Sequence, residues 1–227
     1  MSLSIKDCIQ VIKSKTSENF PHLPETYIQP GVTDQQLDDF ETKYKISLPD
    51  EIKEYLKLSN GEGSNPDDQT QVGVFLGLSM LTLEDIEREM GIWKEVIQDN
   101  PEFETENYEV FPEGAVQNAY VDPDNWVGLA VDGCGNSIGI DLKPGPNGTL
   151  GQVIVFGRDI FDERIVIFKT WREFLNRVVE DLAKPGFYTI DEEYKVYDLA
   201  ETNYLEYIFE EKLKEYKGDE GDEESEE

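Results

Sequence analysis

The chain has 227 residues, of which 38% are hydrophobic and 31% are charged, and its formal net charge is −30 at pH 7. This length suits one large domain better than two, and the composition is that of a globular protein. Lysine and arginine are too scarce for the phosphate contacts of a nucleic-acid-binding protein, so we expect no nucleic-acid partner. The charge favours a basic protein partner, although an acid excess that merely maintains solubility is the simpler interpretation of composition alone.

The two cysteines, Cys8 and Cys134, are far apart in the sequence and do not suggest a disulfide framework. Segment 1–15 lacks the long apolar run of a signal peptide. The longest uncharged run, 69–83, is shorter than the roughly 20 apolar residues of a membrane span. We therefore expect a cytoplasmic protein that does not contact a membrane and is a monomer or a weak dimer.

The N-terminal part predicts a helix, an arm and a second helix. Apolar residues at helical spacing predict a short amphipathic helix over 3–15. Prolines recur over 20–31 and indicate an extended arm. Thr33 and Gln36 have the spacing of a capping box, in which two side chains satisfy the free N–H groups of a helix start, so a helix should begin there.

The next segment predicts a helix, a strand and a longer helix. Pro49 suits the first position of a helix, where its missing N–H is no loss, and Asn60-Gly61 should end that helix with a left-handed cap. The apolar segment 72–76 predicts a strand. Thr82 should cap a helix whose apolar residues are spaced by four, three and four positions.

The centre of the sequence predicts a three-stranded meander. Three apolar runs, 127–131, 138–142 and 152–156, are separated by breaks rich in glycine and proline. The first break begins with Asp132-Gly133, a dipeptide typical of hairpin turns. These runs are apolar on both sides, so both faces of the sheet should be covered.

The remaining segments are less regular. Segment 102–119 has no clear pattern, and 164–169 is a further candidate strand. Apolar residues predict an amphipathic helix over 171–182 and a last helix over 205–216, while 187–197 fits either a strand or an arm.

Three ordered sequence blocks, which span roughly residues 33–183, resemble the signature of the SUKH superfamily. They are most similar to its fungal cell-wall assembly regulator (Smi/Knr) branch. The central block extends from Trp126 to Asp159, a second lies between Leu48 and Gly61, and the third is the helix that starts at Trp171. The matching positions, which we expect to be structural, are Leu48, Pro49, Asn60, Gly61, Trp126, Asp132, Gly135, Asn136, Asp141, Pro144, Gly145, Gly151 and Gln152.

The resemblance implies an α+β fold, a single SUKH-like domain with a curved, mixed or antiparallel sheet and helices packed at its N- and C-terminal sides. This core domain should cover 33–185, after an N-terminal helix and arm over 1–32. We expect 186–217 to be an extension whose helix packs on the core. The acidic segment 218–227 cannot bury apolar surface and should be disordered.

The superfamily also contains bacterial immunity proteins, which bind and block toxins that are often nucleases. An acidic binder suits a basic nuclease, and the chain lacks the long extra segments of the fungal regulators. Our first interpretation is therefore a non-catalytic immunity protein with a basic toxin domain as its partner. The alternative is a regulatory or signalling scaffold of cell-wall synthesis of the fungal type.

Catalytic chemistry has little support in the sequence. The single histidine, His22, has no companion at the spacing of a metal site or a nucleophile–base pair. A carboxylate-based hydrolase would need Asp132 and Asp141 in one cleft, whereas the simpler interpretation assigns both to turn hydrogen bonds. A small-molecule-binding domain would need a roomy apolar pocket. We expect no enzyme, cofactor or metal.

The candidate contact surface is an acidic rim formed by two loops. Asp67 and Asp68 lie in one predicted loop, and Asp122 and Asp124 lie in the other, just before Trp126. Aromatic side chains dominate binding hot spots, so Trp126 could anchor a partner. A tryptophan at the start of a strand more often packs a helix onto a sheet.

Overall fold

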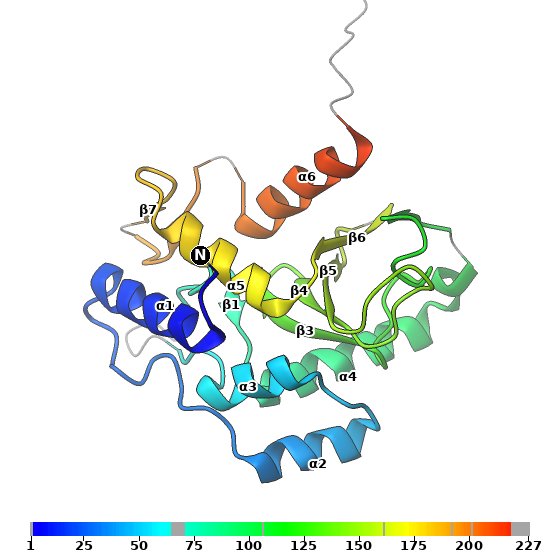
Figure 1. Ribbon diagram of the computed structural model, residues 1–227, viewed down its shortest axis with the longest axis horizontal. Coiled ribbons are helices and arrows are strands. Elements are labelled where there is room, and N and C mark those ends of the chain that lie inside the picture. Colours follow the sequence, from blue (N-terminus) through cyan, green and yellow to red (C-terminus); the bar gives the residue numbers. More distant parts are fainter. Residues whose placement is uncertain are drawn as a thin grey trace, which may run out of the picture.

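The computed structural model places helices around a central sheet (Figure 1). The residues that it describes are 2–64, 71–105, 107–160, 162–191, 193–200 and 202–218. The helices are α1 (Ile5–Asn19), α2 (Asp34–Tyr44), α3 (Asp50–Leu58), α4 (Leu83–Asp99), the 3-10 helix η1 (Pro101–Thr105), α5 (Trp171–Leu182) and α6 (Tyr204–Lys217). The strands are β1 (Ser79–Met80), β2 (Glu109–Phe111), β3 (Trp126–Val131), β4 (Asn136–Asp141), β5 (Gln152–Gly157), β6 (Glu163–Phe168), β7 (Thr189–Ile190) and β8 (Tyr197–Asp198).

The predicted meander is the centre of the sheet. Strands β3, β4 and β5 pair antiparallel, and the strand order of the sheet is β1-β3-β4-β5-β6-β2. The candidate strand over 164–169 is β6, which pairs antiparallel with β5. Strand β2, from a segment without a clear sequence pattern, pairs parallel with β6. The sheet is therefore mixed, and the predicted α+β class is confirmed.

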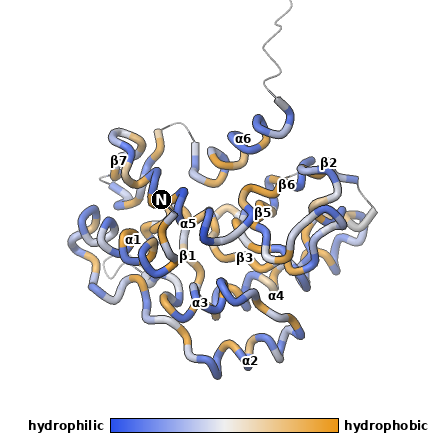
Figure 2. Tube along the Cα trace, viewed as in Figure 1, coloured by the Kyte–Doolittle hydropathy of each residue, from blue (hydrophilic) through white to orange (hydrophobic). Residues whose placement is uncertain are grey.

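Both faces of the meander are buried, as its apolar strands predict. Alternate residues point to opposite faces of a strand. Val127 and Val153 face the main core, to which α1, α3 and α5 contribute. Trp126 and Ile154 face a second cluster, where Trp93 of α4 and residues of the loop before β3 cover them. Figure 2 shows the hydrophobic segments gathered at the sheet, inside a more hydrophilic periphery.

Two helices begin at the predicted capping residues. Thr33 and Gln36 form a capping box at α2, and Thr82 forms one with Asp85 at α4. At α4 the Thr82 side chain accepts from the Asp85 N–H at 3.0 Å, and the Asp85 carboxylate accepts from the Thr82 N–H at 3.2 Å. These local patterns predict helix starts well because both partners lie within one turn.

The predicted strand over 72–76 is wrong, because this segment folds into a buried turn instead. Gly73 and Gly77 have positive φ angles of 70° and 100°, and the Gly77 N–H donates to the Gly73 carbonyl at 2.8 Å. The apolar side chains are buried nevertheless. An apolar run specifies burial, and the two glycines decide that the chain reverses before it reaches the short strand β1.

Two predictions at the ends of α3 are also wrong. Pro49 precedes the helix as its N-cap, and the helix is followed by Ser59 in an extended conformation. The φ angle of Gly61 is +75°, as a left-handed residue requires, but Gly61 lies beyond the helix end. The Asn60 side chain accepts from the Leu83 N–H at 2.8 Å. The Asn60-Gly61 pair therefore joins the end of α3 to the start of α4.

The terminal helices share the main core with the rest of the chain. Ile5 and Cys8 of α1 and Leu205 and Ile208 of α6 are all buried in the same hydrophobic cluster as the meander. No described helix combines the length and the apolar composition that crossing a lipid bilayer requires.

Candidate protein-binding surface

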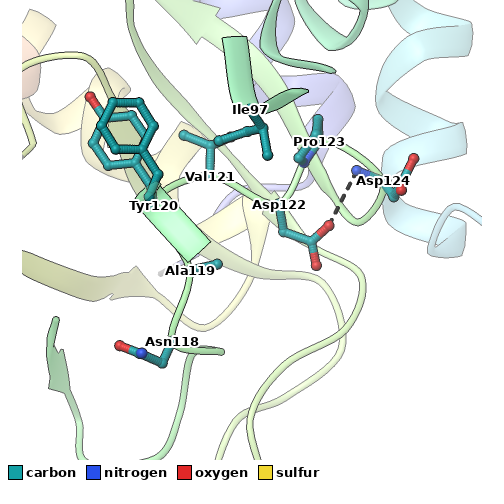
Figure 3. Close-up of a pocket in the computed structure, with 9 residues that line it drawn as sticks. Ile97, Asn118, Ala119, Tyr120, Val121, Asp122, Pro123 and Asp124 are labelled. Atoms are coloured by element: carbon teal, nitrogen blue, oxygen red, sulfur yellow. Dashed lines mark hydrogen bonds between the residues drawn. The ribbon is translucent and has the colours of Figure 1, made fainter. Parts of the chain in front are cut away.

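Two residues of the predicted acidic rim, Asp122 and Asp124, border a hollow of about 280 Å³. The segment 118–124 forms one wall, while Ile97 of α4 and Phe103 of η1 complete the lining. Figure 3 shows Ile97 beside Val121 and the Asp122 carboxylate turned toward Asp124. We call this cavity the 118–124 hollow.

Hydrogen bonds within the segment fix the acidic side of the hollow. The Asp122 carboxylate accepts from the Asp124 N–H at 3.2 Å and from the Asn125 side-chain amide at 2.8 Å. Such bonds from a side chain to the backbone two residues later shape a tight turn. The exposed Asp124 carboxylate lies 2.7 Å from Lys94 Nζ, which ties the loop to α4.

A buried arginine supports the other end of the 118–124 wall. Arg164 of β6 is 1% exposed, and its Nε donates to the Ala119 carbonyl at 2.6 Å. The guanidinium lies 3.8 Å from the centroid of the Tyr108 ring. Tyr120 packs on Phe103, with ring centroids 4.2 Å apart. Arg164 was not among the predicted site residues, although a single cation inside an apolar strand is a usable signal for a buried anchoring role.

Trp126 is not an exposed anchor, and this part of the predicted rim is wrong. Its side chain is 1% exposed, and its ring packs against Phe156 with centroids 5.5 Å apart. The residue belongs to β3 on the sheet face that the preceding loop covers, so no partner reaches it. Asp67 and Asp68 lie outside the described residues.

The family positions at the first hairpin form a hydrogen-bonded turn. Asp132 accepts from the Cys134 N–H at 2.7 Å and from the Asn136 N–H at 3.1 Å, and the Asn136 side chain donates to it at 2.7 Å. Asn136 also accepts from the Asp159 N–H at 2.8 Å. The Gly135 carbonyl accepts from the residue after Gly157 at 3.0 Å. These bonds join the start of β4 and the end of β5, which lie side by side at one end of the strand pair, to the hairpin loop.

A second group of family positions closes the other end of the same strands. Asp141 accepts from the Lys143 N–H at 2.9 Å and from the Gln152 side chain at 3.0 Å. Gln152 also donates to the Ala115 carbonyl at 2.8 Å, and the Gly145 N–H donates to that same carbonyl at 2.9 Å. The loop that covers the second core cluster is therefore bonded directly to the end of the meander.

Further family positions join the second sequence block to the meander. A side chain at Gly151, whose φ angle is +79°, would meet the ring of Pro49 at 2.9 Å. Only glycine allows both this backbone conformation and this approach. Leu48 is buried, and its N–H donates to the Glu41 carboxylate at 2.7 Å. The Pro144 carbonyl accepts from a glutamine side chain of the covering loop at 3.1 Å.

Asp132 and Asp141 do not share a cleft. They lie at opposite ends of β4, and five strand steps of about 3.3 Å separate those ends by about 17 Å. Burial raises the pKa of Asp141, while hydrogen bonds from Lys143 and Gln152 oppose that change. Both carboxylates accept the turn hydrogen bonds described above, so the geometry required for a hydrolase that uses this pair is absent.

Comparison with known protein families identifies the family to which this domain belongs. The model of the SMI1 / KNR4 family (SUKH-1) matches residues 31–177, which include the meander, the second sequence block and α4. The chain belongs to the SMI1/KNR4 (SUKH-1) family. The resemblance seen in the sequence blocks is confirmed, and the fold is that of a SUKH domain.

Curated relatives of this SUKH-1 domain are fungal. "Cell wall biosynthesis/cell cycle regulator smi1" of Schizosaccharomyces pombe is 36% identical over 174 residues, which cover 72% of this chain and 33% of the relative. "Cell wall assembly regulator SMI1" of Saccharomyces cerevisiae is 30% identical, with 78% and 40% covered. "Glucan synthesis regulatory protein" of Neurospora crassa is 29% identical, with 78% and 38% covered. The chain thus spans between a third and two fifths of the length of these relatives.

These relatives bear on the two interpretations drawn from the sequence. Their names describe regulators of wall or glucan synthesis, and no finding supports the interpretation as an immunity protein. The findings therefore favour the alternative, a scaffold of the fungal type, over our first interpretation.

Proposed function

We propose that this SUKH-1 domain is a non-catalytic protein-binding module that takes part in the regulation of cell-wall synthesis. The observation that carries the proposal is the similarity to the regulator of Schizosaccharomyces pombe, at 36% identity over 72% of the chain. A regulator that acts by binding needs a stable scaffold with accessible side chains at its surface.

The geometry supports a binding role over a catalytic one. The polar positions of the family blocks, such as Asp132, Asn136 and Asp141, form hydrogen bonds that hold turns together. The 118–124 hollow has an acidic border formed by Asp122 and Asp124. Together with the net charge of −30, this border supports a basic protein partner, which long-range attraction would bring to the domain.

A domain replacement tests the proposal. The region of the Schizosaccharomyces pombe regulator that matches this chain would be exchanged for the chain, and wall glucan content and resistance to wall-digesting enzymes would be measured. We expect the chimera to restore both properties relative to a strain whose regulator lacks that region. A chimera that accumulates normally and still behaves like the deletion would contradict the proposal.

A further inference from the structure

A groove lies between α2 and α4. It has a volume of about 340 Å³, and buried Phe40 and Leu83 contribute its apolar lining. The acidic side chains of Asp39, Glu84 and Glu87 border it. A second hollow of about 290 Å³ shares Asn60 and Glu84 with this groove and extends it past the start of α4.

The groove and the 118–124 hollow lie along one side of α4. Glu84, Glu87, Gly91 and Lys94 recur every three or four positions, so they follow one side of the helix. Lys94 joins the two ends, because its Nζ lies 2.7 Å from Asp124 and 5.5 Å from the centroid of a tyrosine ring at the end of α2. We call this strip, from the groove across Gly91 to Asp124, the α4 surface; it is about 15–20 Å long at 1.5 Å per residue.

The charges of the α4 surface suit a cationic ligand. Lys43 lies 2.7 Å from Glu87, and Lys94 is paired with Asp124, so both cations already have acidic partners. Asp39 and Glu84 are exposed, and neither forms an ion pair within the described residues. Two carboxylates without a described cationic partner thus stand beside an apolar groove, although Asp39 accepts from the Gln35 side-chain amide at 2.9 Å. This combination fits a lysine or arginine flanked by an apolar side chain.

A second observation, independent of the charges, is the glycine at position 91 in the middle of the α4 surface. It lies inside α4, where glycine is less favourable than any other residue except proline. A Cβ placed there would meet nothing within 4 Å, so no packing inside the described structure requires glycine. A partner whose backbone crosses the helix closely at this point would require it, because a side chain would hold that backbone away.

We propose that the α4 surface binds an extended, basic segment of a partner protein, with the segment's backbone crossing α4 at Gly91. Its lysine or arginine side chains lie against Asp39 and Glu84, and an apolar side chain enters the groove over Phe40 and Leu83. This inference rests on the proposed function and names the surface and the chemistry of the partner.

The first test locates binding on the whole chain. The probe is a fluorescein-labelled peptide of about ten residues that alternates arginine and leucine, with a glutamate–leucine peptide as its control. Backbone amide NMR of the ¹⁵N-labelled chain should show shifts concentrated in α4, the facing side of α2 and segment 118–124. Shifts spread over the acidic surface, or centred on another face, would overturn the proposal.

The second test uses two phenylalanine variants of the same helix. Gly91→Phe should weaken peptide binding by about tenfold or more, whereas Ile92→Phe, which adds a ring to an exposed position about 100° around the helix, should change it less than about twofold. Gly91→Phe should not lower the melting temperature, because phenylalanine is a better helix former than glycine. Equal binding by both variants would refute the crossing at Gly91.

The third test concerns charge and the choice of occupant. The double variant Asp39→Asn, Glu84→Gln should weaken binding more than removal of two carboxylates on α6, such as Glu206→Gln with Glu210→Gln.

Sedimentation of the chain alone tests self-association, and a dimer that Gly91→Phe dissociates would assign the surface to a second copy of the chain instead. The chimeric regulator separates this inference from the proposed function. If the chimera restores wall glucan content and resistance to wall-digesting enzymes equally well with and without Gly91→Phe, the α4 surface is not the binding site and the proposed function stands.

Discussion

Glu62, in the segment between α3 and β1, carries a carboxyl group that is almost completely shielded from water. Its side chain is 1% exposed, and one of its oxygens accepts from the Val74 N–H at 3.2 Å. Burial raises the pKa of Glu62 to about 8, although the hydrogen bond from Val74 and others partly oppose that change. In the folded protein this group is therefore mainly protonated at neutral pH.

The raised pKa of Glu62 predicts a pH-dependent loss of stability. As pH rises above about 4.5, the unfolded chain releases this proton while the folded chain keeps it until about pH 8. The free energy of unfolding should fall across this window and stay level above it. The variant Glu62→Gln, which is neutral throughout, should match the parent near pH 4 and exceed it by at least about 1 kcal/mol at pH 8, because one pKa unit corresponds to about 1.4 kcal/mol. Urea unfolding at both pH values checks this, and an advantage at pH 4 alone would contradict it.

Removing the Asn136 side chain should destabilise the first hairpin. Asn136→Ala deletes two donated hydrogen bonds, to Asp132 and Asp159, and one accepted from the Asp159 N–H. We expect a loss of about 1–2 kcal/mol in the free energy of unfolding, because a buried side chain loses three hydrogen bonds while its partly exposed partners regain water. The neighbouring Arg158→Ala, at a largely exposed side chain, should cost no more than about 0.5 kcal/mol. Denaturant unfolding of both variants provides the comparison.

At the scale of elements, α6 is held to the domain by a group of charged and tyrosine side chains. Arg177 of α5 contacts Asp181 at 2.6 Å, and its two terminal nitrogens reach the Glu211 carboxylate of α6. The Tyr204 hydroxyl donates to the buried Asp181 at 2.8 Å. The hydrogen bonds from Arg177 hold the pKa of the Glu211 carboxyl below its usual range. Because the pairs are largely desolvated, losing one partner is costlier here than at a surface pair.

Arg177→Ala should release α6 before it unfolds the domain. Asp181 keeps Lys184 as a second cation, so we expect a loss of about 2–3 kcal/mol, below the full cost of an isolated buried charge. Hydrogen exchange should accelerate about 30- to 100-fold in α6, with smaller effects in the meander. Lys15→Ala, which breaks an exposed pair with Glu18, should leave exchange in α6 unchanged. Equal acceleration in β4 and α6 would mean that α6 does not open by itself.

At the scale of the whole molecule, the net charge of −30 is a property of both stability and recognition. Like charges repel most strongly in the compact state, where they are closest together. The same field attracts cationic partners from a distance and is screened by salt over about 8–10 Å at physiological ionic strength. Salt should therefore have opposite effects on folding and on binding of a basic partner.

Raising sodium chloride from about 0.05 to 0.5 M should stabilise the folded chain, because screening relieves the self-repulsion. The check is the urea midpoint, since urea is uncharged and leaves ionic strength unchanged. The midpoint should rise with salt, and binding of the arginine–leucine peptide should weaken over the same range. A midpoint that falls with salt would show that favourable ion pairs outweigh repulsion between the acids.

Local sequence patterns determined much of this fold. The capping residues Thr33 and Thr82, the three apolar runs of the meander and the amphipathic helices are recognisable because their partners lie within a few residues along the chain. The ordered family blocks led to the SUKH domain for the same reason: they record turns and strand ends whose hydrogen bonds demand particular side chains.

Only the tertiary structure decided what depends on contacts between distant segments. It buried Trp126, turned 72–76 back on itself and paired β2 with β6 across about fifty residues. It also aligned the groove, Gly91 and Asp124 along α4, although α2 and the loop before β3 are far apart in sequence. Hydrophobic pattern specifies that a residue is buried, whereas the packing of elements selects what covers it and which surfaces remain open to a partner.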